Sequence, residues 1–326
     1  MNLLYLLVLV AGFFILIKSA DFVIESSSVI AKRAGISTLV IGLTLVAFGT
    51  SLPEFAVSLI SSISAYVQGT NADIAIGNVI GSNFANLTLI LGVAAFLTPL
   101  TIPKNIIKND MPYLLMVSVV FVILLSQFGS SPMMYRLEGL ILLIFFGYYL
   151  YILSREKKVT HDIETHPMSV SKSWILLLLG FLGVALGGYL VTYFAERLSI
   201  SLLVDLLNMN PEKVTAFVGL TVVAFGTSLP ELVTTIVAIR KKEQAIAIGN
   251  VVGSNIFNIL LVAGSSSLII PLGVTSEFII DAILVVFVTF IIYVFIYYIK
   301  KPHKLFGWML LNFYISYLIY IIIRTL

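Results

Sequence analysis

The segment GLTLVAFGTSLPE at residues 42–54 returns at residues 219–231 as GLTVVAFGTSLPE. A second matched pair follows in the same order, with IAIGNVIGSN at 74–83 and IAIGNVVGSN at 246–255. Two long matches in the same order are beyond chance, so the sequence is an internal duplication. Its one strongly polar connector lies at 155–172, which predicts a first repeat at 1–154 and a second repeat at 173–326.

The composition is that of a polytopic membrane protein rather than a soluble one. Of the 326 residues, 60% are hydrophobic and 11% are charged, and the mean hydropathy is +1.09. Apolar runs long enough to cross a bilayer recur along the whole sequence. We expect ten transmembrane helices, at 2–31, 37–65, 71–98, 110–128, 134–154, 173–196, 214–239, 243–270, 276–299 and 305–323.

Five helices in each half force the second repeat to enter the membrane from the opposite face. An inverted repeat with matched interruptions is typical of secondary transporters. A duplication that merely enlarged a helical bundle is the alternative, but such a bundle has no need of buried acids. The sequence therefore predicts an all-α membrane protein built from two inverted five-helix repeats.

Pro53 and Pro230 fall inside the second and seventh predicted helices. Proline lacks a backbone N–H, and its ring clashes with the carbonyl four residues earlier. We expect both helices to break at GTSLPE, which would free backbone carbonyls to act as ligands in a polar cavity.

Glu54 and Glu231 follow these prolines directly, at about mid-span, and no basic residue lies at comparable depth in the same helices. A carboxylate inside a membrane is costly and is a functional candidate by default. Thr50 and Thr227 precede the two acids by four residues, which places each hydroxyl on the helix face of its acid.

The next helix of each half adds a second stripe of oxygen atoms, at Ser82 and Asn86 and at Ser254 and Asn258. For Asn78 and Asn250, helix packing and ligation remain equally open. An all-oxygen ligand set suits Ca²⁺ and Na⁺. Cysteine is absent and the three histidines fall in loops, which excludes soft metal sites and a Ser/His protease in the membrane.

Most of the 19 basic residues fall on one side of the predicted helices, so the positive-inside rule predicts that both termini lie outside. A few charges lie toward the ends of the first and sixth helices. Snorkelling or interfacial ion pairs explain them better than gating of the entrance. These residues are Lys18, Asp21, Glu25, Glu196 and Arg197.

GTSLPE followed by GNVIGSN, twice and inverted, resembles the two alpha-repeats of the sodium/calcium exchangers, within the calcium/cation antiporter superfamily. The resemblance covers nearly the whole chain and is to the prokaryotic type, with a short central loop.

The resemblance implies an ion site between the second, third, seventh and eighth helices. The central Ca²⁺ ligands would be Glu54 and Glu231, beside the carbonyls of Thr50 and Thr227. The flanking Na⁺ positions map onto the Ala47 carbonyl, Ser51 and Ser254 on one side, and onto the Ala224 carbonyl, Ser228 and Ser82 on the other. Asn86 and Asn258 complete the middle.

The resemblance also implies exchange of three Na⁺ for one Ca²⁺ by alternating access, with the first and sixth helices sliding across a fixed core. Potassium-dependent relatives and some microbial members carry Asp where this chain has Asn258, which argues against K⁺ co-transport. An H⁺-coupled Ca²⁺ exchanger and, less favoured, a cation channel remain alternatives. We expect no enzymatic activity, no cofactor, no nucleic acid and no obligate protein partner, and a place in a prokaryotic plasma membrane.

Overall fold

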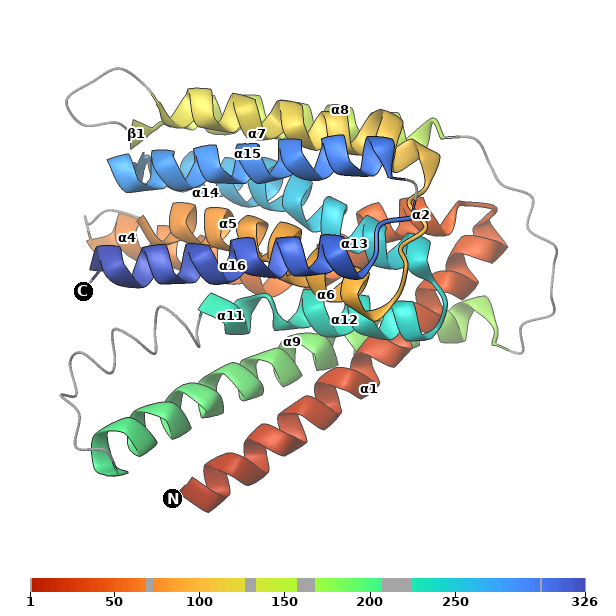
Figure 1. Ribbon diagram of the computed structural model, residues 1–326, viewed down its shortest axis with the longest axis horizontal. Coiled ribbons are helices and arrows are strands. Elements are labelled where there is room, and N and C mark those ends of the chain that lie inside the picture. Colours follow the sequence, from red (N-terminus) through yellow and green to blue (C-terminus); the bar gives the residue numbers. More distant parts are fainter. Residues whose placement is uncertain are drawn as a thin grey trace.

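A computed structural model describes residues 2–68, 73–126, 133–156, 168–206, 224–299 and 301–325. These residues are almost entirely helical, and Figure 1 shows the long helices running in roughly one direction. Two short strands, β1 (Met133–Met134) and β2 (Leu272–Gly273), form an antiparallel pair.

Several helices contain π-helical turns, in which the backbone hydrogen bond reaches one residue further than in an α-helix; the labels η mark them. The first half comprises α1 (Asn2–Ala34), α2 (Thr38–Ile41), η1 (Gly42–Val46), α3 (Ala47–Thr50), α4 (Leu52–Gln68), α5 (Asp73–Ala85), η2 (Asn86–Ile90), α6 (Leu91–Leu97), η3 (Ile106–Asp110), α7 (Met111–Leu125) and α8 (Arg136–Ser154). The second half comprises α9 (Val170–Ser201), η4 (Leu202–Leu206), α11 (Ala224–Thr227), α12 (Leu229–Arg240), α13 (Gln244–Phe257), η6 (Asn258–Ala263), α14 (Gly264–Ile269), α15 (Ser276–Tyr298) and α16 (Lys304–Thr325).

Eight helices in the described residues are long and apolar enough to cross a membrane, and a bent pair makes up to nine. The pair joins Thr38–Thr50 to Leu52–Gln68 at an angle of 46°. The span predicted at 214–239 lies partly at 207–223, outside the described residues, so the count of ten stays a prediction. The two ends of the chain lie toward the same side of the molecule in Figure 1.

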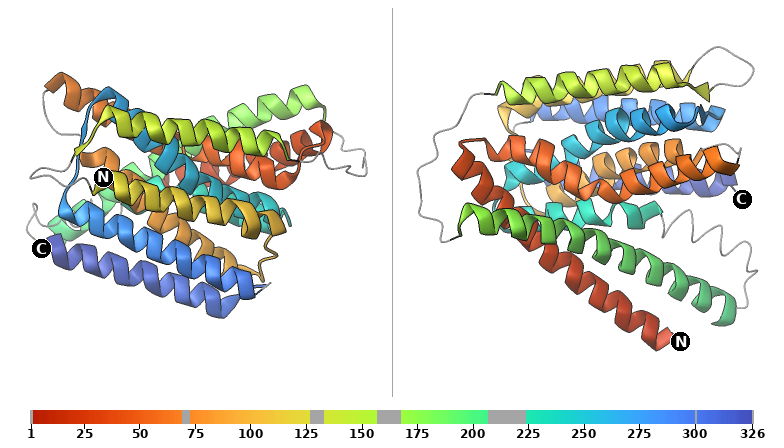
Figure 2. Two further views of the ribbon diagram at one scale, coloured as in Figure 1. Left: turned by 90° about the horizontal axis from the view of Figure 1, so that it is seen from above. Right: turned by 180° about the vertical axis from the view of Figure 1, so that it is seen from behind.

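Helices α1 and α9 form a tightly packed pair along one edge of the molecule (Figures 1 and 2). Glycines on α9 allow the close approach. A Cβ atom on Gly187 would lie 2.7 Å from the backbone nitrogen of Leu16, and one on Gly180 would lie 2.8 Å from Val23. Small residues at such a contact let two membrane helices pack backbone to backbone.

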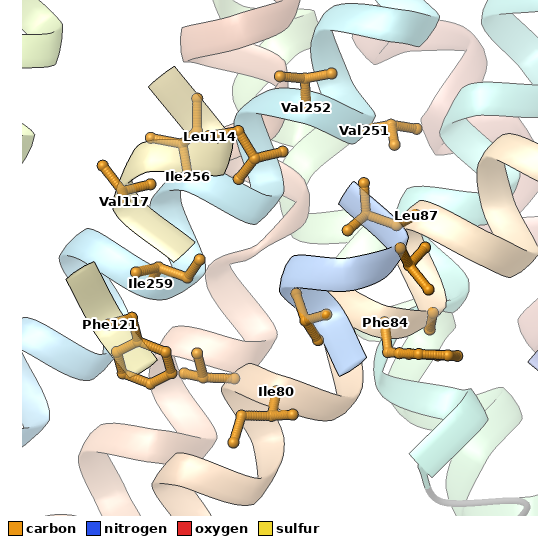
Figure 3. Close-up of a cluster of buried hydrophobic side chains, with 14 of the residues drawn as sticks. Ile80, Phe84, Leu87, Leu114, Val117, Phe121, Val251, Val252, Ile256 and Ile259 are labelled. Atoms are coloured by element: carbon orange, nitrogen blue, oxygen red, sulfur yellow. The ribbon is translucent and has the colours of Figure 1, made fainter. Parts of the chain in front are cut away.

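Two spans lie at the centre of the molecule. In an 18-residue apolar stretch of the spans Ile74–Leu97 and Gln244–Ile269, 78% and 89% of the residues are buried, against 22–39% in the corresponding stretches of the other single-helix spans. Figure 3 shows their apolar side chains packed with those of α7, among them Phe84, Phe121 and Ile256. Gly249 brings α13 against α2 and η1, since a Cβ there would lie 2.8 Å from the Leu39 carbonyl oxygen. The two matched sequence segments therefore supply the core.

Candidate cation site

The two GTSLPE segments adopt the same local structure. Helix α3 ends at Thr50 and α4 begins at Leu52, with Ser51 between them at φ −84° and ψ 5°. In the second half α11 ends at Thr227 and α12 begins at Leu229, and Ser228 has φ −89° and ψ 4°. Since proline has no N–H to donate, the helical hydrogen-bond ladder is interrupted in both places.

Glu54 and Glu231 lie in the first turns of α4 and α12, and both side chains are buried. They are close enough to interact electrostatically. Both carboxylate oxygens of Glu54, and Oε2 of Glu231, have no hydrogen-bond partner among the described residues. Among the residues that the structure describes, no ion pair involves either glutamate. Buried carboxylate oxygens of this kind are costly unless a cation or a proton reaches them.

Hydrogen bonds tie the break in the first repeat to the second repeat. The Ser51 hydroxyl donates to Oε1 of Glu231 at 2.9 Å. The Thr50 hydroxyl donates to Oδ1 of Asn250 at 3.0 Å, and the Asn250 amide donates to the Thr235 hydroxyl at 3.3 Å. The site is thus assembled from both halves of the chain.

Most of the other predicted ligands are buried, and several have oxygen atoms for which the described segments offer no hydrogen-bond partner. These atoms are Oδ1 of Asn86, Oδ1 of Asn258, and the hydroxyls of Ser228 and Ser254. Ser82 is buried, and Thr227 is half-buried at the end of α11.

The two alanine carbonyls that were predicted as ligands are those of Ala47 and Ala224. The Ala47 carbonyl accepts from the Ser51 backbone N–H at 3.0 Å and from the Thr50 hydroxyl at 3.3 Å. Ala224 is the first residue of α11, and its side chain lies outside the described residues.

The central helices bring the two stripes of oxygen atoms to the broken helices. Segment η2 lies against α12 and α13, while η6 lies against α4 and α5. Asn86 and Asn258 are each the first residue of one of these π-helical segments. Such turns occur often at functional sites because they redirect side chains. The sequence carries no signal that would have predicted them.

For Asn78 and Asn250 the sequence left helix packing and ion ligation equally open. In the structure both side chains form hydrogen bonds beside the glutamates. The Asn78 amide donates to the Ser58 hydroxyl at 3.0 Å and to the Glu54 carbonyl at 3.2 Å. Asn250 contacts Thr235 in the second repeat, and Ser58 and Thr235 each lie four residues after a glutamate. Sequence reasoning missed these two hydroxyls, although the i, i+4 spacing could have indicated them.

Comparison with known proteins identifies the family of the chain. A sequence model described as sodium/calcium exchanger protein matches residues 4–155 and 172–323. The chain belongs to the sodium/calcium exchanger family. The predicted resemblance is therefore confirmed, and it extends through both repeats.

Individual members of the exchanger family match over most of their length. The sodium/calcium exchanger MaX1 of Methanosarcina acetivorans is 34% identical, with 80% of this chain and 83% of that protein covered. An uncharacterized membrane protein of Methanocaldococcus jannaschii is 33% identical over 74% of each chain. A structure of the sodium-calcium exchanger NCX_Mj, soaked with 10 mM Na⁺ and no Ca²⁺, superposes with a TM-score of 0.79 at 30% identity. That match covers 97% of this chain and 98% of the other.

The exchanger family consists of membrane transporters, and its members here are exchangers rather than enzymes. The prediction of a multi-pass membrane antiporter is thereby confirmed. Within the described residues, no group of three or more His, Cys, Asp or Glu side chains could hold a resident metal ion.

Proposed function

We propose that this protein exchanges Na⁺ for Ca²⁺ across a membrane through a site centred on Glu54 and Glu231. One observation carries the proposal: two buried glutamates, one from each GTSLPE segment, leave three of their four carboxylate oxygens without a partner in the part of the chain that the structure describes. Two carboxylates balance one Ca²⁺ or two Na⁺, so one kind of ion has to leave before the other is bound.

In the proposed site, Ca²⁺ binds between Glu54 and Glu231, beside the carbonyls of Thr50 and Thr227. Na⁺ binds on either flank, at Ser51, Ser254 and the Ala47 carbonyl, and at Ser228, Ser82 and the Ala224 carbonyl. Asn86 and Asn258 supply neutral oxygens in the middle. Hard cations favour such ligands. The unpartnered oxygens of Ser228, Ser254 and the two asparagines support this assignment.

We further propose that transport proceeds by alternating access with three Na⁺ per Ca²⁺. A cavity of about 250 Å³ reaches Pro53, Thr227 and Pro230 from one side, between α9 and the broken helices. At the other end α1 packs along α12. This asymmetry supports a carrier that opens to one side at a time. Exchange of three Na⁺ for one Ca²⁺ moves one net charge across the membrane. The free energy of that movement changes by about 2.3 kcal/mol per 100 mV of membrane potential.

The proposed location is a prokaryotic plasma membrane with both termini outside. The two ends of the chain lie toward the same face of the molecule in Figure 1, and the sequence places most basic residues in the connections that the ten-helix topology assigns to the other side. The positive-inside rule then assigns the basic face to the cytoplasm. The ions are the substrates, and we propose no cofactor and no protein partner.

The test is ⁴⁵Ca²⁺ uptake into proteoliposomes loaded with Na⁺, with Na⁺ removed outside and the pH equal on both sides. Uptake that requires internal Na⁺ and stops when the Na⁺ gradient is dissipated supports the proposal. Uptake that ignores Na⁺ and follows an imposed pH gradient would make the protein an H⁺-coupled exchanger. Current carried without any counter-ion would make it a channel.

A further inference from the structure

The turn between α12 and α13 contacts α1 through charged and polar side chains. The Lys241 ammonium group lies 3.3 Å from Oε2 of Glu25 and 3.6 Å from Oδ1 of Asp21. The Ser28 hydroxyl donates to Oε1 of Glu243 at 2.6 Å. Asp21, Glu25 and Ser28 share one face of α1, so these contacts join the first repeat to the second.

The backbone of this turn is unusual. Lys242 has a φ of 64°. Among the described residues it is the one non-glycine residue with a positive φ. A side chain in this left-handed region is unfavourable, and glycine would adopt it more readily. The turn is closed by hydrogen bonds from the Lys241 N–H to the Val237 carbonyl at 2.9 Å and from the Glu243 N–H to the Ala238 carbonyl at 2.8 Å. The turn therefore has a defined shape that places Lys241 and Glu243 on either side of Lys242, against α1.

The two ends of the α1–α9 pair differ. At the face opposite the chain ends, the contacts of Lys241 and Glu243 hold α1 to the second repeat (Figure 1). Toward the chain ends, a cavity is lined by residues of α9, α4, α11 and α12, with Val57 and Glu196 in its wall. In the described part of the chain no ion pair joins α9 to these helices.

We infer that Lys241, Asp21 and Glu25, together with Ser28 and Glu243, form a releasable clamp that keeps the ion path shut at the face opposite the chain ends. The inference rests on the proposed transport by alternating access, because opening that face requires α1 to leave α12. The side chains of Lys241, Asp21 and Glu25 are 32%, 33% and 42% exposed. Such half-exposed pairs are weak and are screened by salt, which suits a contact that breaks in every cycle.

Release of the clamp also changes the charge of the opening. In the closed form Lys241 offsets Asp21 and Glu25, and Glu243 is engaged by Ser28. Once α1 has moved, Asp21 and Glu25 no longer have Lys241 beside them, while Lys241 stays on the turn with Glu243. The two carboxylates of α1 then carry a local negative charge that attracts cations. The clamp would thus both close the path and, when open, leave two unpaired acids on α1 for the cations that use it.

The absence of cysteine from the chain permits a direct test. Ala238→Cys places a thiol in the buried region behind the turn, and Val57→Cys places one in the cavity. The rate of labelling by a cationic, water-soluble methanethiosulfonate is measured for each thiol in detergent-solubilised protein. We expect Lys241→Gln to raise the Ala238→Cys rate by about threefold and to lower the Val57→Cys rate, as a weak exposed pair allows.

The charge swap Lys241→Glu with Glu25→Lys should return both rates toward their starting values. Lys104→Gln is the matched control, since this exposed lysine lies on the same face, near Thr101, which bonds Gln244. Glu25→Gln replaces Lys241→Gln if that variant does not fold, as judged by size-exclusion chromatography. Unchanged rates, or a change that the swap does not reverse, would overturn the clamp. Labelling needs no ion gradient, so its result is independent of which ion drives transport.

Discussion

The hydroxyl of Ser51 donates a 2.9 Å hydrogen bond to Oε1 of Glu231, so the break in one repeat holds the glutamate of the other. Within the described ranges, the matching hydroxyl of Ser228 has no partner, and neither has the carboxylate of Glu54. The repeats are close copies in sequence, yet the site they form is asymmetric in its hydrogen bonds.

Neutralising either glutamate should abolish exchange. We expect Glu54→Gln and Glu231→Gln each to lower Ca²⁺ affinity by at least about tenfold, or about 1.4 kcal/mol, because each removes one charge from the site. Calcium-dependent thermal stabilisation of the purified protein measures the affinity, and ⁴⁵Ca²⁺ flux measures transport. Glu277→Gln, an exposed acid at the start of α15, is the control and should behave as the unchanged protein. Normal flux in both glutamine variants would show that the carboxylates are not the site.

Ser51→Ala and Ser228→Ala should separate stability from ion binding. A hydrogen bond to a charged group is worth about 1.5–3 kcal/mol, so loss of the Ser51 donor should lower the melting temperature in the absence of ions. Ser228 has no such bond to lose, and its alanine variant should melt as the unchanged protein does. Both variants should need more Na⁺ for half-maximal exchange. Equal melting shifts in the two variants would contradict the asymmetry of the hydrogen bonds.

Asn250 should matter more than Asn78, because Asn250 joins Thr50 of one repeat to Thr235 of the other. We expect Asn250→Ala to reduce Ca²⁺ flux by about tenfold, and Asn78→Ala, whose contacts stay within one repeat, to have a milder effect. Thr50→Val keeps the carbonyl and removes the hydroxyl. Its effect should add little to that of Asn250→Ala, since both break the same bond. Full additivity of the two changes in flux would refute the coupling.

Arg324 and Asp281 fasten α16 to α15 through two parallel hydrogen bonds, at 3.0 and 3.1 Å. Asp281 is buried, so Arg324→Gln strands a carboxylate and should destabilise the protein by about 3 kcal/mol. The second change, Asp281→Asn, should recover part of the loss. Thermal unfolding in detergent measures both effects. Since the pair lies away from the glutamates, the Ca²⁺ affinity of the folded fraction should stay constant.

Glycine at 249 should resist replacement. Alanine there would bring a Cβ to within 2.8 Å of the Leu39 carbonyl oxygen and 2.9 Å of the Leu43 nitrogen, both of them backbone atoms that cannot rotate away. We expect Gly249→Ala to cost about 1–3 kcal/mol of stability. Gly147→Ala, with no atom within 4 Å of the added Cβ among the described residues, is the control. Equal melting temperatures of the Gly249→Ala and Gly147→Ala variants would show that α13 can move away from α2 and η1 without loss of stability.

The sequence predicted the helical class, the duplication and the two glutamates because each depends on local pattern. Apolar length, a repeated motif and an acid beside a proline are visible in the letters themselves. It predicted interfacial ion pairs for charges on the first helix, and Asp21 and Glu25 do form them with Lys241.

The partners across the repeats were not predictable. Bonds such as Ser51 to Glu231 and Thr50 to Asn250 join residues about 180 to 200 positions apart, and they depend on how two helices are rotated against each other. The π-helical turns at Asn86 and Asn258 shift that rotation within a helix. Neither effect leaves a periodic trace in the sequence.

The deep burial of the two central spans has a consequence for the bilayer around the protein. Lipid molecules contact the outer helices, while the stripes that carry Ser82, Asn86, Ser254 and Asn258 are screened from acyl chains by protein on nearly every side. Changes in membrane thickness or headgroup charge should therefore act on how fast the peripheral helices move. In the proposed site, the choice between one cation and another would be made in a compartment that the lipid does not reach.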